Sequence, residues 1–413
     1  MLVDEWTKVR SEVATIRYIQ RNTTIPIPKI HAYGNGEFLT KDKHTTQSFI
    51  IMDEVFGKPL DTDNLCSSAT DIQDRFIDEF VGILVQLHEL EFPRTGSLYP
   101  DDADEEQPII GPSLYMLENE MQVITGIRRE APPALTTTTD VIKYLRGVWE
   151  EFEAIPCFDF IKSYAKRHIF SQVSFANLLP DYCKSSPNLQ PLALSHADLR
   201  RENILVDDDF RIQGIIDWEW VTILPRQLCV PPLWISGLDP YMVHYKRDDS
   251  NKIFEAFQRA TSANDRYKEY DKYLKFWKED PFRLPISIIL RSQCHLDTLY
   301  YPHIYSALYK KPFDTMAPTF FASEDMQSRL KHREETEKRY VDYLKQEGLY
   351  SVTEEDLQKR ARLEKMDKWL EEVKTRWERS FGHPMPEWCP VTDCDECRVS
   401  MEPWQPPQDN VQE

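Results

Sequence analysis

The sequence predicts an α+β protein in which a small β-containing part precedes a large, mostly helical part. Two observations support this fold class. Runs rich in β-branched and aromatic residues occur at 49–55, 204–206 and 211–218, and they are short enough to be strands. Most of the remaining chain carries apolar residues at spacings of three and four, which is the helical period. With 413 residues the chain can form roughly two to three folding units.

The N-terminal part is predicted to contain one helix and one buried strand. The helix spans residues 4–21, because Asp4 can cap it and apolar side chains recur on one face: Val9, Val13, Ile16 and Ile19. Two prolines then lead into an extended segment. The strand spans 49–55, and the turn Gly57-Lys58-Pro59 ends it.

The rest of the chain is predicted to consist of helices around one β-hairpin. A strongly amphipathic helix covers about 70–90, and the segment 91–112 is rich in Pro and Asp, which is typical of a loop. The hairpin turns at Asp207-Asp208-Asp209, and a second long loop follows at about 223–240. Further helices are predicted at 113–128, 139–155, 158–180, 251–280, 285–309, 323–347 and 354–381.

Composition excludes several classes of protein. The formal net charge of −19 argues against a nucleic-acid partner, which needs a basic face. The N-terminus carries charges every few residues and does not read as a signal peptide. No window has the ~18 uninterrupted apolar residues of a membrane span. The eight cysteines are spread out, which is typical of reduced thiols. We therefore expect a cytoplasmic protein without a nucleic-acid or membrane partner.

The last part of the chain, from residue 383 onward, turns to Pro, Cys and acidic residues, which predicts a poorly ordered tail. Cys389, Cys394 and Cys397, with His383 upstream, have the ligand count of a tetrahedral zinc site. The spacing contains only one C-x-x-C pair, and neighbouring carboxylates raise thiol pKa values. A zinc site and free thiols both remain open interpretations.

The stretch LSHADLRRENILVDDDFRIQGIIDWEW at 194–220 concentrates the residues that can carry chemistry. A hairpin of this length brings the loop before its first strand beside the end of its second strand, so Asp198, Asn203 and Asp217 can converge. Asn203 and Asp217 are hard oxygen donors of the kind that Mg²⁺ takes together with phosphate oxygens. Asp198 could orient a substrate hydroxyl or amine and accept its proton, while His196 would brace the loop.

Phosphoryl transfer requires this set of groups: a positioned base, one or two metal ions and little covalent chemistry. A rival interpretation is metal-assisted hydrolysis, which tends to use more His and carboxylate ligands at closer spacing. A third is a capped hairpin whose carboxylates only form turns. The four-residue pattern, with strands of the correct type around it, argues against this third interpretation.

The pattern H-x-D-L-x-x-x-N-I-L-V, followed by I-I-D-W-E, resembles the aminoglycoside phosphotransferase family, and more narrowly its fungal branch. The segments SEVATIRYIQRNTTIPIPKIHAYG, FIIMDEVFGKPL, LHELEFPRTGSLY and PPLWISG resemble family segments in the family's order, over about 5–240. The resemblance implies a protein-kinase-like two-lobed α+β fold, with a small N-lobe, a large, mostly helical C-lobe, and ATP bound between them.

By the same resemblance, Asp198 matches the catalytic base, and Asn203 and Asp217 match the Mg²⁺ ligands. The residues that match the interlobe hinge, whose backbone groups hold adenine, are Asp53, Glu54 and Val55. Glu12 matches the helix glutamate that pairs with a lysine of the small lobe. The implied domains are an N-lobe with hinge at 1–56, a C-lobe at 57–382 and the tail at 383–413.

The sequence departs from the family pattern in its small lobe, which we expect to be truncated. The helix that carries Glu12 begins almost at the first residue of the sequence, so we expect the phosphate-binding strands that precede this helix in the family to be missing. Lys8, one turn before Glu12, is expected to point along the helix. Without the phosphate clamp and the paired lysine, much of the positioning and charge stabilisation of a kinase is lost.

Three interpretations follow from this departure. The sequence can be a shortened version of an active kinase, a divergent kinase, or a pseudokinase-like module that binds a ligand without catalysis. We expect an ATP- and Mg²⁺-dependent phosphotransferase acting on the hydroxyl or amine of a small molecule, with the non-catalytic binding module as the alternative.

Overall fold

The computed structural model describes residues 5–38, 46–104, 107–116, 118–119, 132, 134–153, 162–185, 192–232 and 247–351, with single residues between 353 and 379. The chain forms two compact units, Met1–Lys338 and Arg339–Glu413. The second unit contains the C-terminal end of α13 (Glu324–Gln346), where Gly348 adopts a left-handed conformation (φ 68°). The candidate site lies in the first unit. Most of the predicted helix 354–381, and the whole tail from 383, lie outside the described residues.

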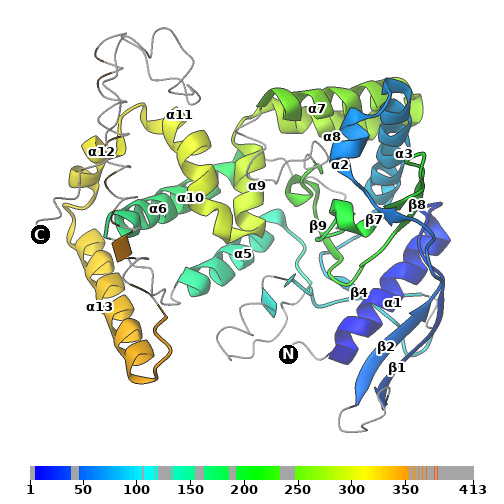
Figure 1. The fold of residues 1–413 in the computed structure, drawn as a ribbon, viewed down its shortest axis with the longest axis horizontal. Coiled ribbons are helices and arrows are strands. Elements are labelled where there is room, and N and C mark those ends of the chain that lie inside the picture. Colours follow the sequence, from blue (N-terminus) through cyan, green and yellow to red (C-terminus); the bar gives the residue numbers. More distant parts are fainter. Residues whose placement is uncertain are drawn as a thin grey trace, which may run out of the picture. The chain divides into compact units, whose positions relative to one another are not determined.

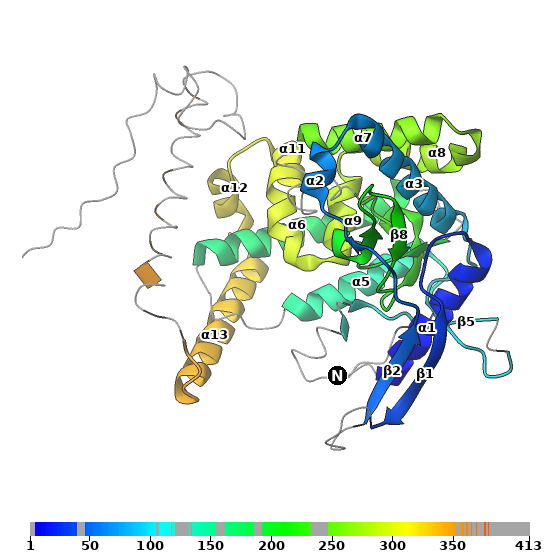
Figure 2. The ribbon, with the colours of Figure 1, turned by 45° about the vertical axis from the view of Figure 1, so that its right-hand side comes forward.

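The N-terminal elements form a helix packed on a β-hairpin. Helix α1 (Glu5–Asn22) contacts strands β1 (Ile30–Glu37) and β2 (Gln47–Met52), which pair antiparallel (Figures 1 and 2). The apolar side chains that predicted the helix include three that are fully buried: Val13, Ile16 and Ile19. The predicted helix and strand are confirmed, although the strand ends at Met52 and the extended segment before it is itself a strand.

Beyond β2 the chain crosses to the predicted hairpin. Strand β3 (Lys58–Pro59) joins β7 (Ile204–Val206) and β8 (Ile212–Ile215) in a three-stranded sheet. Gly57, at φ 157°, comes so close to the next strand that a Cβ would lie 2.9 Å from the carbonyl oxygen of Val206. A glycine is therefore required where the chain enters this sheet.

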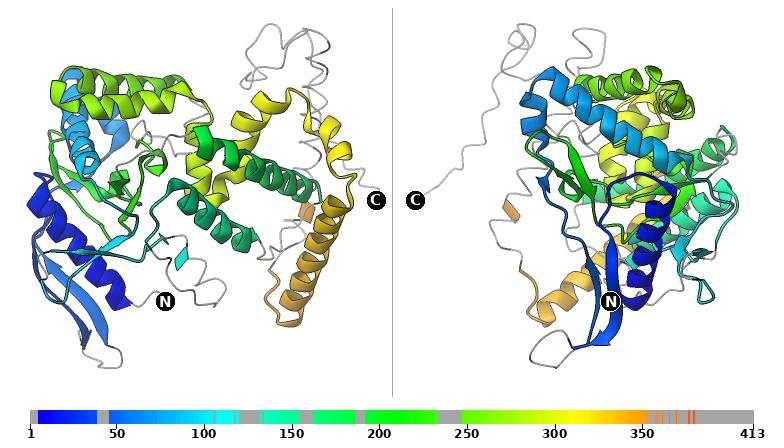
Figure 3. Two further views of the ribbon diagram at one scale, coloured as in Figure 1. Left: turned by 180° about the vertical axis from the view of Figure 1, so that it is seen from behind. Right: turned by 90° about the vertical axis from the view of Figure 1, so that its right-hand side faces the viewer.

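A bundle of helices covers this sheet. Helix α3 (Thr70–Glu89) buries the predicted apolar stripe and packs on α7 (Arg247–Ser262), which packs on α8 (Lys268–Glu279). The short helix α2 (Thr62–Ser67) precedes α3, and the side chain of Asp61 caps its first backbone amides. Figure 3 shows these helices from behind.

Two short antiparallel pairs complete the β-structure. Strand β4 (Ser97–Tyr99) pairs with β5 (Ile109–Gly111), and β6 (Leu192–Ser195) pairs with β9 (Thr222–Pro225). The prediction of loops at 91–112 and from 223 was therefore wrong at these strands. Their side chains meet α1 and α3 in a core that includes Ile16, Leu87, Leu194, Ile215 and Trp218.

The remaining helices form a third core around Phe170. They are α5 (Thr138–Glu153), α6 (Lys162–Ser185), α9 (Arg283–Arg291), α10 (Leu296–Leu299), α11 (Ser306–Tyr309), α12 (Phe313–Phe320) and α13. The predicted single helix 285–309 is divided by a 3₁₀ turn and a π-helical segment, Tyr300–Tyr305. The predicted helix 113–128 lies mostly outside the described residues. Among the described helices, none is long and apolar enough to cross a membrane.

Candidate active site

The loop between β6 and β7 holds Asp198 by two neighbouring side chains. The amide nitrogen of Asn203 donates to the backbone oxygen of Asp198 at 2.8 Å and to its Oδ2 at 3.3 Å. Arg200 Nε lies 3.1 Å from the same Oδ2. Burial raises the pKa of the Asp198 carboxyl, whereas Arg200 and Asn203 oppose that rise. The carboxylate is thus fixed in position by an amide and a guanidinium.

The β7–β8 hairpin brings Asp217 beside Asn203, as the sequence predicts. Ile204 faces Ile215 in the register, and one step further the Ile216 amide donates to the Asn203 carbonyl at 3.0 Å. Asp217 has a φ of 65°, a left-handed conformation that directs it out of the strand. Burial, then Glu219 and Asp198, raise the pKa of Asp217, so these carboxylates are electrostatic neighbours.

A further acidic group reaches the same place from α1. Glu12 has its pKa raised to about 7, first by burial and then by the negative charges of Glu219 and Asp217. Lys8 forms an ion pair with Glu219 and lies 4.9 Å from the centre of the Trp220 ring. The expectation that Lys8 points only along its helix is therefore wrong, because Lys8 connects α1 to the loop after Asp217.

His196 stabilises the loop that carries Asp198 through contacts with the residues before and after Asp217. Its ring lies 4.7 Å from the Trp218 ring, and its Nε2 donates to the carbonyl of Ile216 at 3.2 Å. Burial lowers the pKa of His196 to about 4, so the imidazole is neutral at pH 7. The neutral His196 ring thus connects the loop that carries Asp198 to the end of the hairpin that carries Asp217, and it fixes their relative position.

The segment that matches a hinge runs beside the hairpin. The Asp53 amide donates to the carbonyl of Lys29, and a hydrogen bond with His31 at 2.5 Å lowers the pKa of the Asp53 carboxyl. Val55 packs so closely over Gly214 that a Cβ there would lie 2.7 Å from Val55 Cγ1. The backbone of 53–55 therefore reaches the strand that leads to Asp217, although the Asp53 amide is already used.

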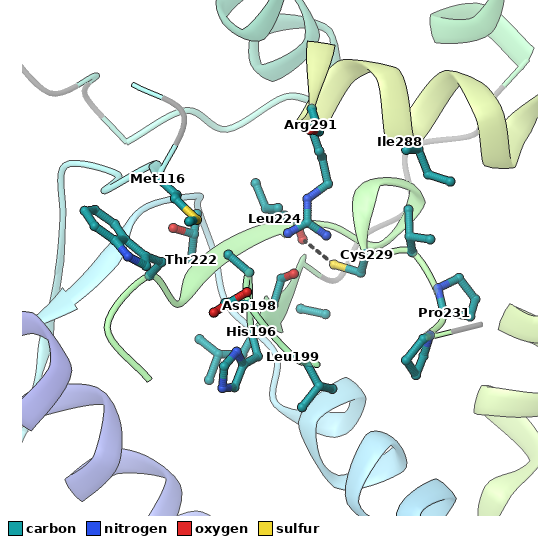
Figure 4. A pocket seen from close by; sticks show the side chains of 18 of the residues that line it. Met116, His196, Asp198, Leu199, Thr222, Leu224, Cys229, Pro231, Ile288 and Arg291 are labelled. Carbon is teal, nitrogen blue, oxygen red and sulfur yellow. Dashed lines mark hydrogen bonds between the residues drawn. The ribbon is translucent and has the colours of Figure 1, made fainter. Parts of the chain in front are cut away.

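A cavity of about 820 Å³ opens on one side of this site (Figure 4). Asp198 lines the cavity, whereas Asn203 and Asp217 do not. Most of the wall is apolar or aromatic and includes Leu114, Leu145, Trp220, Tyr270 and Ile288. Asp198 therefore lines the cavity and is at the same time an electrostatic neighbour of Asp217 and Glu219.

Three functional candidates were missed by the sequence interpretation. Glu219 was not among the candidate catalytic or metal-binding residues, and Lys8 was expected to point along its helix. A helical pattern could have paired Lys8 with Glu12, since residues four apart share a face. Arg291, whose side chain extends into the cavity, carries no signal in the sequence, because only tertiary packing brings it there.

A model of the phosphotransferase enzyme family matches residues 7–227, more than half of the 413 residues. The chain belongs to this family. The match includes both strands of the β7–β8 hairpin and the loop that carries Asp198. Family membership accords with the α+β architecture and with the kinase-like fold predicted from the same segments.

The chain is also similar to individual proteins. It is 27% identical over 238 residues to clavilactone A biosynthesis cluster protein Y of Ampulloclitocybe clavipes, covering 56% of this chain and 54% of that protein. The chain spans about half the length of the curated relatives it matches. A solved aminoglycoside phosphotransferase, APH(4)-Ia in its apo form, is 15% identical with a TM-score of 0.36, over 81% of this chain and 84% of that one. A solved ethanolamine kinase of Plasmodium vivax is 16% identical with a TM-score of 0.37, over 79% of this chain and 75% of that one.

Proposed function

We propose that this phosphotransferase moves the terminal phosphoryl group of ATP to a hydroxyl or amine of a small molecule, with Mg²⁺ as cofactor. One observation carries the proposal. The hairpin gathers Asp198, Asn203 and Asp217, and Asp198 alone of the three lines the cavity. An acceptor in the cavity and a nucleotide on the opposite side would then meet at Asp198, which is the arrangement that phosphoryl transfer needs.

The donor set fits a hard divalent cation. Three carboxylates, those of Glu12, Asp217 and Glu219, are electrostatic neighbours, and Lys8 forms an ion pair with Glu219. Within the described ranges, no three His, Cys, Asp or Glu side chains form a metal site by themselves. Asn203 and Asp217 would therefore hold Mg²⁺ together with phosphate oxygens and water, as Mg²⁺ prefers. When bound, the ion neutralises charge that develops on the phosphates.

The residues of the chain would divide the remaining work. Asp198, held by Asn203 and Arg200, accepts the proton of the acceptor hydroxyl or amine. His196 keeps the loop and the hairpin together. Backbone groups of Glu54 and Val55 would bind adenine, since the Asp53 amide is used by Lys29.

Lys8 is the cation on the nucleotide side of the proposed site. It lies between α1 and the loop after Asp217, where it is paired with Glu219. Burial, Glu219 and Asp217 raise the pKa of Glu12, and the positive charge of Lys8, four residues earlier on the same helix, offsets part of that rise. We propose that Glu12 and Glu219 orient Lys8, and that Lys8 can meet a phosphate oxygen.

The same proposal assigns the parts of the chain. Residues 1–56 would act as the small lobe with its hinge and 57–382 as the large lobe, while 383–413 lie outside the described residues. The charge of −19 argues against a nucleic acid or an anionic membrane surface as partner. The proposed partner is a small molecule, and the proposed location is the cytoplasm.

The experiment is phosphoryl transfer from radiolabelled ATP to a collection of small hydroxyl and amine compounds. The wild type should label at least one compound in the presence of Mg²⁺. Asp198→Asn should reduce labelling by about 10²–10⁴-fold, because the proton acceptor is lost. Lys58→Met, which alters an exposed lysine paired with Asp208, serves as the control with wild-type activity. Equal labelling by Asp198→Asn and the wild type would refute the role of Asp198, and labelling of no compound would favour a non-catalytic binding module.

A further inference from the structure

Arg291 places a positive charge on the wall of the cavity that faces Asp198. It is the last residue of α9, and its guanidinium extends into the cavity toward the side that carries Asp198 (Figure 4). The side chain is half-buried, with the cavity as the space it adjoins. Desolvation is the main cause that lowers the pKa of Arg291. The surrounding protein therefore does little to solvate this charge.

No described carboxylate neutralises Arg291. Its hydrogen bond to protein runs from Nη1 to the Leu228 carbonyl, at a long 3.4 Å. The acidic groups that influence it are a thiol and two phenols, Cys229, Tyr273 and Tyr115. Burial raises the pKa of Cys229 to about 11 and that of Tyr115 to about 12, so both are neutral at pH 7. Arginine stays protonated in proteins, so the charge is uncompensated.

The other charged groups of the wall already have partners. Arg200 pairs with Asp198, and Arg201 pairs with Glu202. Glu118 accepts a hydrogen bond from the Tyr144 hydroxyl. A poorly solvated, uncompensated guanidinium is costly, and a ligand anion that reaches it recovers that cost. Among the described arginine and carboxylate side chains of this wall, Arg291 is therefore the charge that has no charged or hydrogen-bonded side-chain partner.

We propose that the acceptor is an amphipathic carboxylate: its carboxylate binds Arg291, its apolar or aromatic body fills the cavity, and its hydroxyl or amine meets Asp198. This rests on the proposed function, because Asp198 as base defines the reacting end. A planar guanidinium matches a carboxylate with two parallel hydrogen bonds. The apolar part of the wall, which includes Leu145 and Ile288, suits an aromatic ring or a short hydrocarbon body of the ligand.

Three probes with one ring and different end groups test this: 4-hydroxybenzoate, 4-hydroxybenzamide and tyramine. Binding to the full chain is measured calorimetrically without nucleotide. The wild type should bind the carboxylate at least about tenfold more tightly than the amide or the amine, as expected for a hydrogen-bonded charge pair. Arg291→Met should abolish this preference and Arg291→Lys should keep part of it. Arg329→Met, on the exposed face of α13, is the matched control and should keep all of it.

Several results would overturn the proposal. They are equal binding of the three probes, tighter binding of tyramine, undetectable binding of 4-hydroxybenzoate up to its solubility, or an unchanged preference in Arg291→Met. Inorganic sulfate is a further competitor. If sulfate displaces 4-hydroxybenzoate as effectively as a second carboxylate does, Arg291 binds any compact anion, and the proposed carboxylate specificity is overturned. Binding of Mg²⁺-ATP by Arg291→Met verifies that this variant is folded. If the carboxylate preference is found but no ATP is used, the proposed function fails while the assignment of Arg291 stands.

Discussion

At the scale of single residues, the unpaired charge on the cavity wall is opposite in sign to the net charge of the chain. The chain carries −19 overall, which alone would suggest a cationic ligand. On the cavity wall, however, the acidic side chains have polar or charged partners, whereas Arg291 has no carboxylate partner among the described residues and donates only to the Leu228 carbonyl. Short-range desolvation and pairing therefore set the specificity that net charge cannot indicate.

A second residue, His88, makes stability depend on pH. Its ring lies against Tyr270 and Tyr273, and burial, followed by the charge of Arg226, lowers its pKa from 6.5 to about 3. Below pH 6.5 the unfolded chain takes up a proton that the folded state excludes, so the folded state loses stability as the pH falls. Between pH 7 and pH 5 this single group should cost about 2 kcal/mol.

Urea unfolding at pH 7 and at pH 5 measures this loss. His88→Gln should lower the difference between the two pH values by about 2 kcal/mol relative to the wild type. His332→Gln, at an exposed position on α13, is the control and should leave the difference unchanged. An equal pH dependence in His88→Gln and the wild type would contradict a neutral, buried His88.

At the scale of elements, α1 is joined to the loop after the β7–β8 hairpin by the pair of Lys8 and Glu219. Both side chains are about a quarter exposed, at 23% and 26%, so the pair is only partly screened by solvent. Lys8→Met should lower the free energy of unfolding by about 1–2 kcal/mol, because Glu219 is then left facing Glu12 and Asp217.

A double-mutant cycle isolates this contact. In a Glu219→Gln background the effect of Lys8→Met should shrink by about 1 kcal/mol, measured by urea unfolding of the four proteins. Lys58→Met removes the fully exposed pair with Asp208 and should leave the free energy unchanged within error. Additive effects of the two substitutions would show that the pair does not anchor α1.

The entry of the chain into the three-stranded sheet offers another test. Gly57→Ala places a Cβ against the Val206 carbonyl at a φ of 157°, so the free energy of unfolding should fall by about 1–3 kcal/mol. Gly147→Ala, in α5 with open space around it, is the matched control and should be neutral or stabilising by about 0.5–1 kcal/mol. Thermal and urea unfolding of both variants decide, and equal effects would contradict the close approach.

The elements also show what a sequence can predict. The helix from Glu5 and the hairpin around Asp208 were predicted correctly, because periodicity and turn residues are local signals. Strands β4 and β9 were missed, since they are three or four residues long beside Pro and Asp residues typical of loops. The gathering of Asp198, Asn203 and Asp217 followed from spacing, whereas Lys8 and Arg291 reach the site only through tertiary packing.

At the scale of the whole first unit, the site separates two kinds of surface. Glu12, Asp217 and Glu219 form an acidic side that suits a metal-bound nucleotide, and the cavity beyond Asp198 is mostly apolar. The hairpin contacts the hinge segment through Val55, which packs over Gly214 of β8, and the loop that carries Asp198 leads directly into β7. The proposed reaction depends on both sides meeting at Asp198.

The most direct measurement is calorimetric binding of a non-hydrolysable ATP analogue with and without Mg²⁺. Mg²⁺ should strengthen binding to the wild type and to Asp198→Asn alike, since Asp198 is proposed to contact the acceptor. Asp217→Asn should lose the strengthening, by about tenfold or more, because a charged ligand of the ion is removed. Two results would contradict the account: an affinity for the analogue that does not change with Mg²⁺, or a Mg²⁺-dependent gain in affinity that is the same in Asp217→Asn and the wild type.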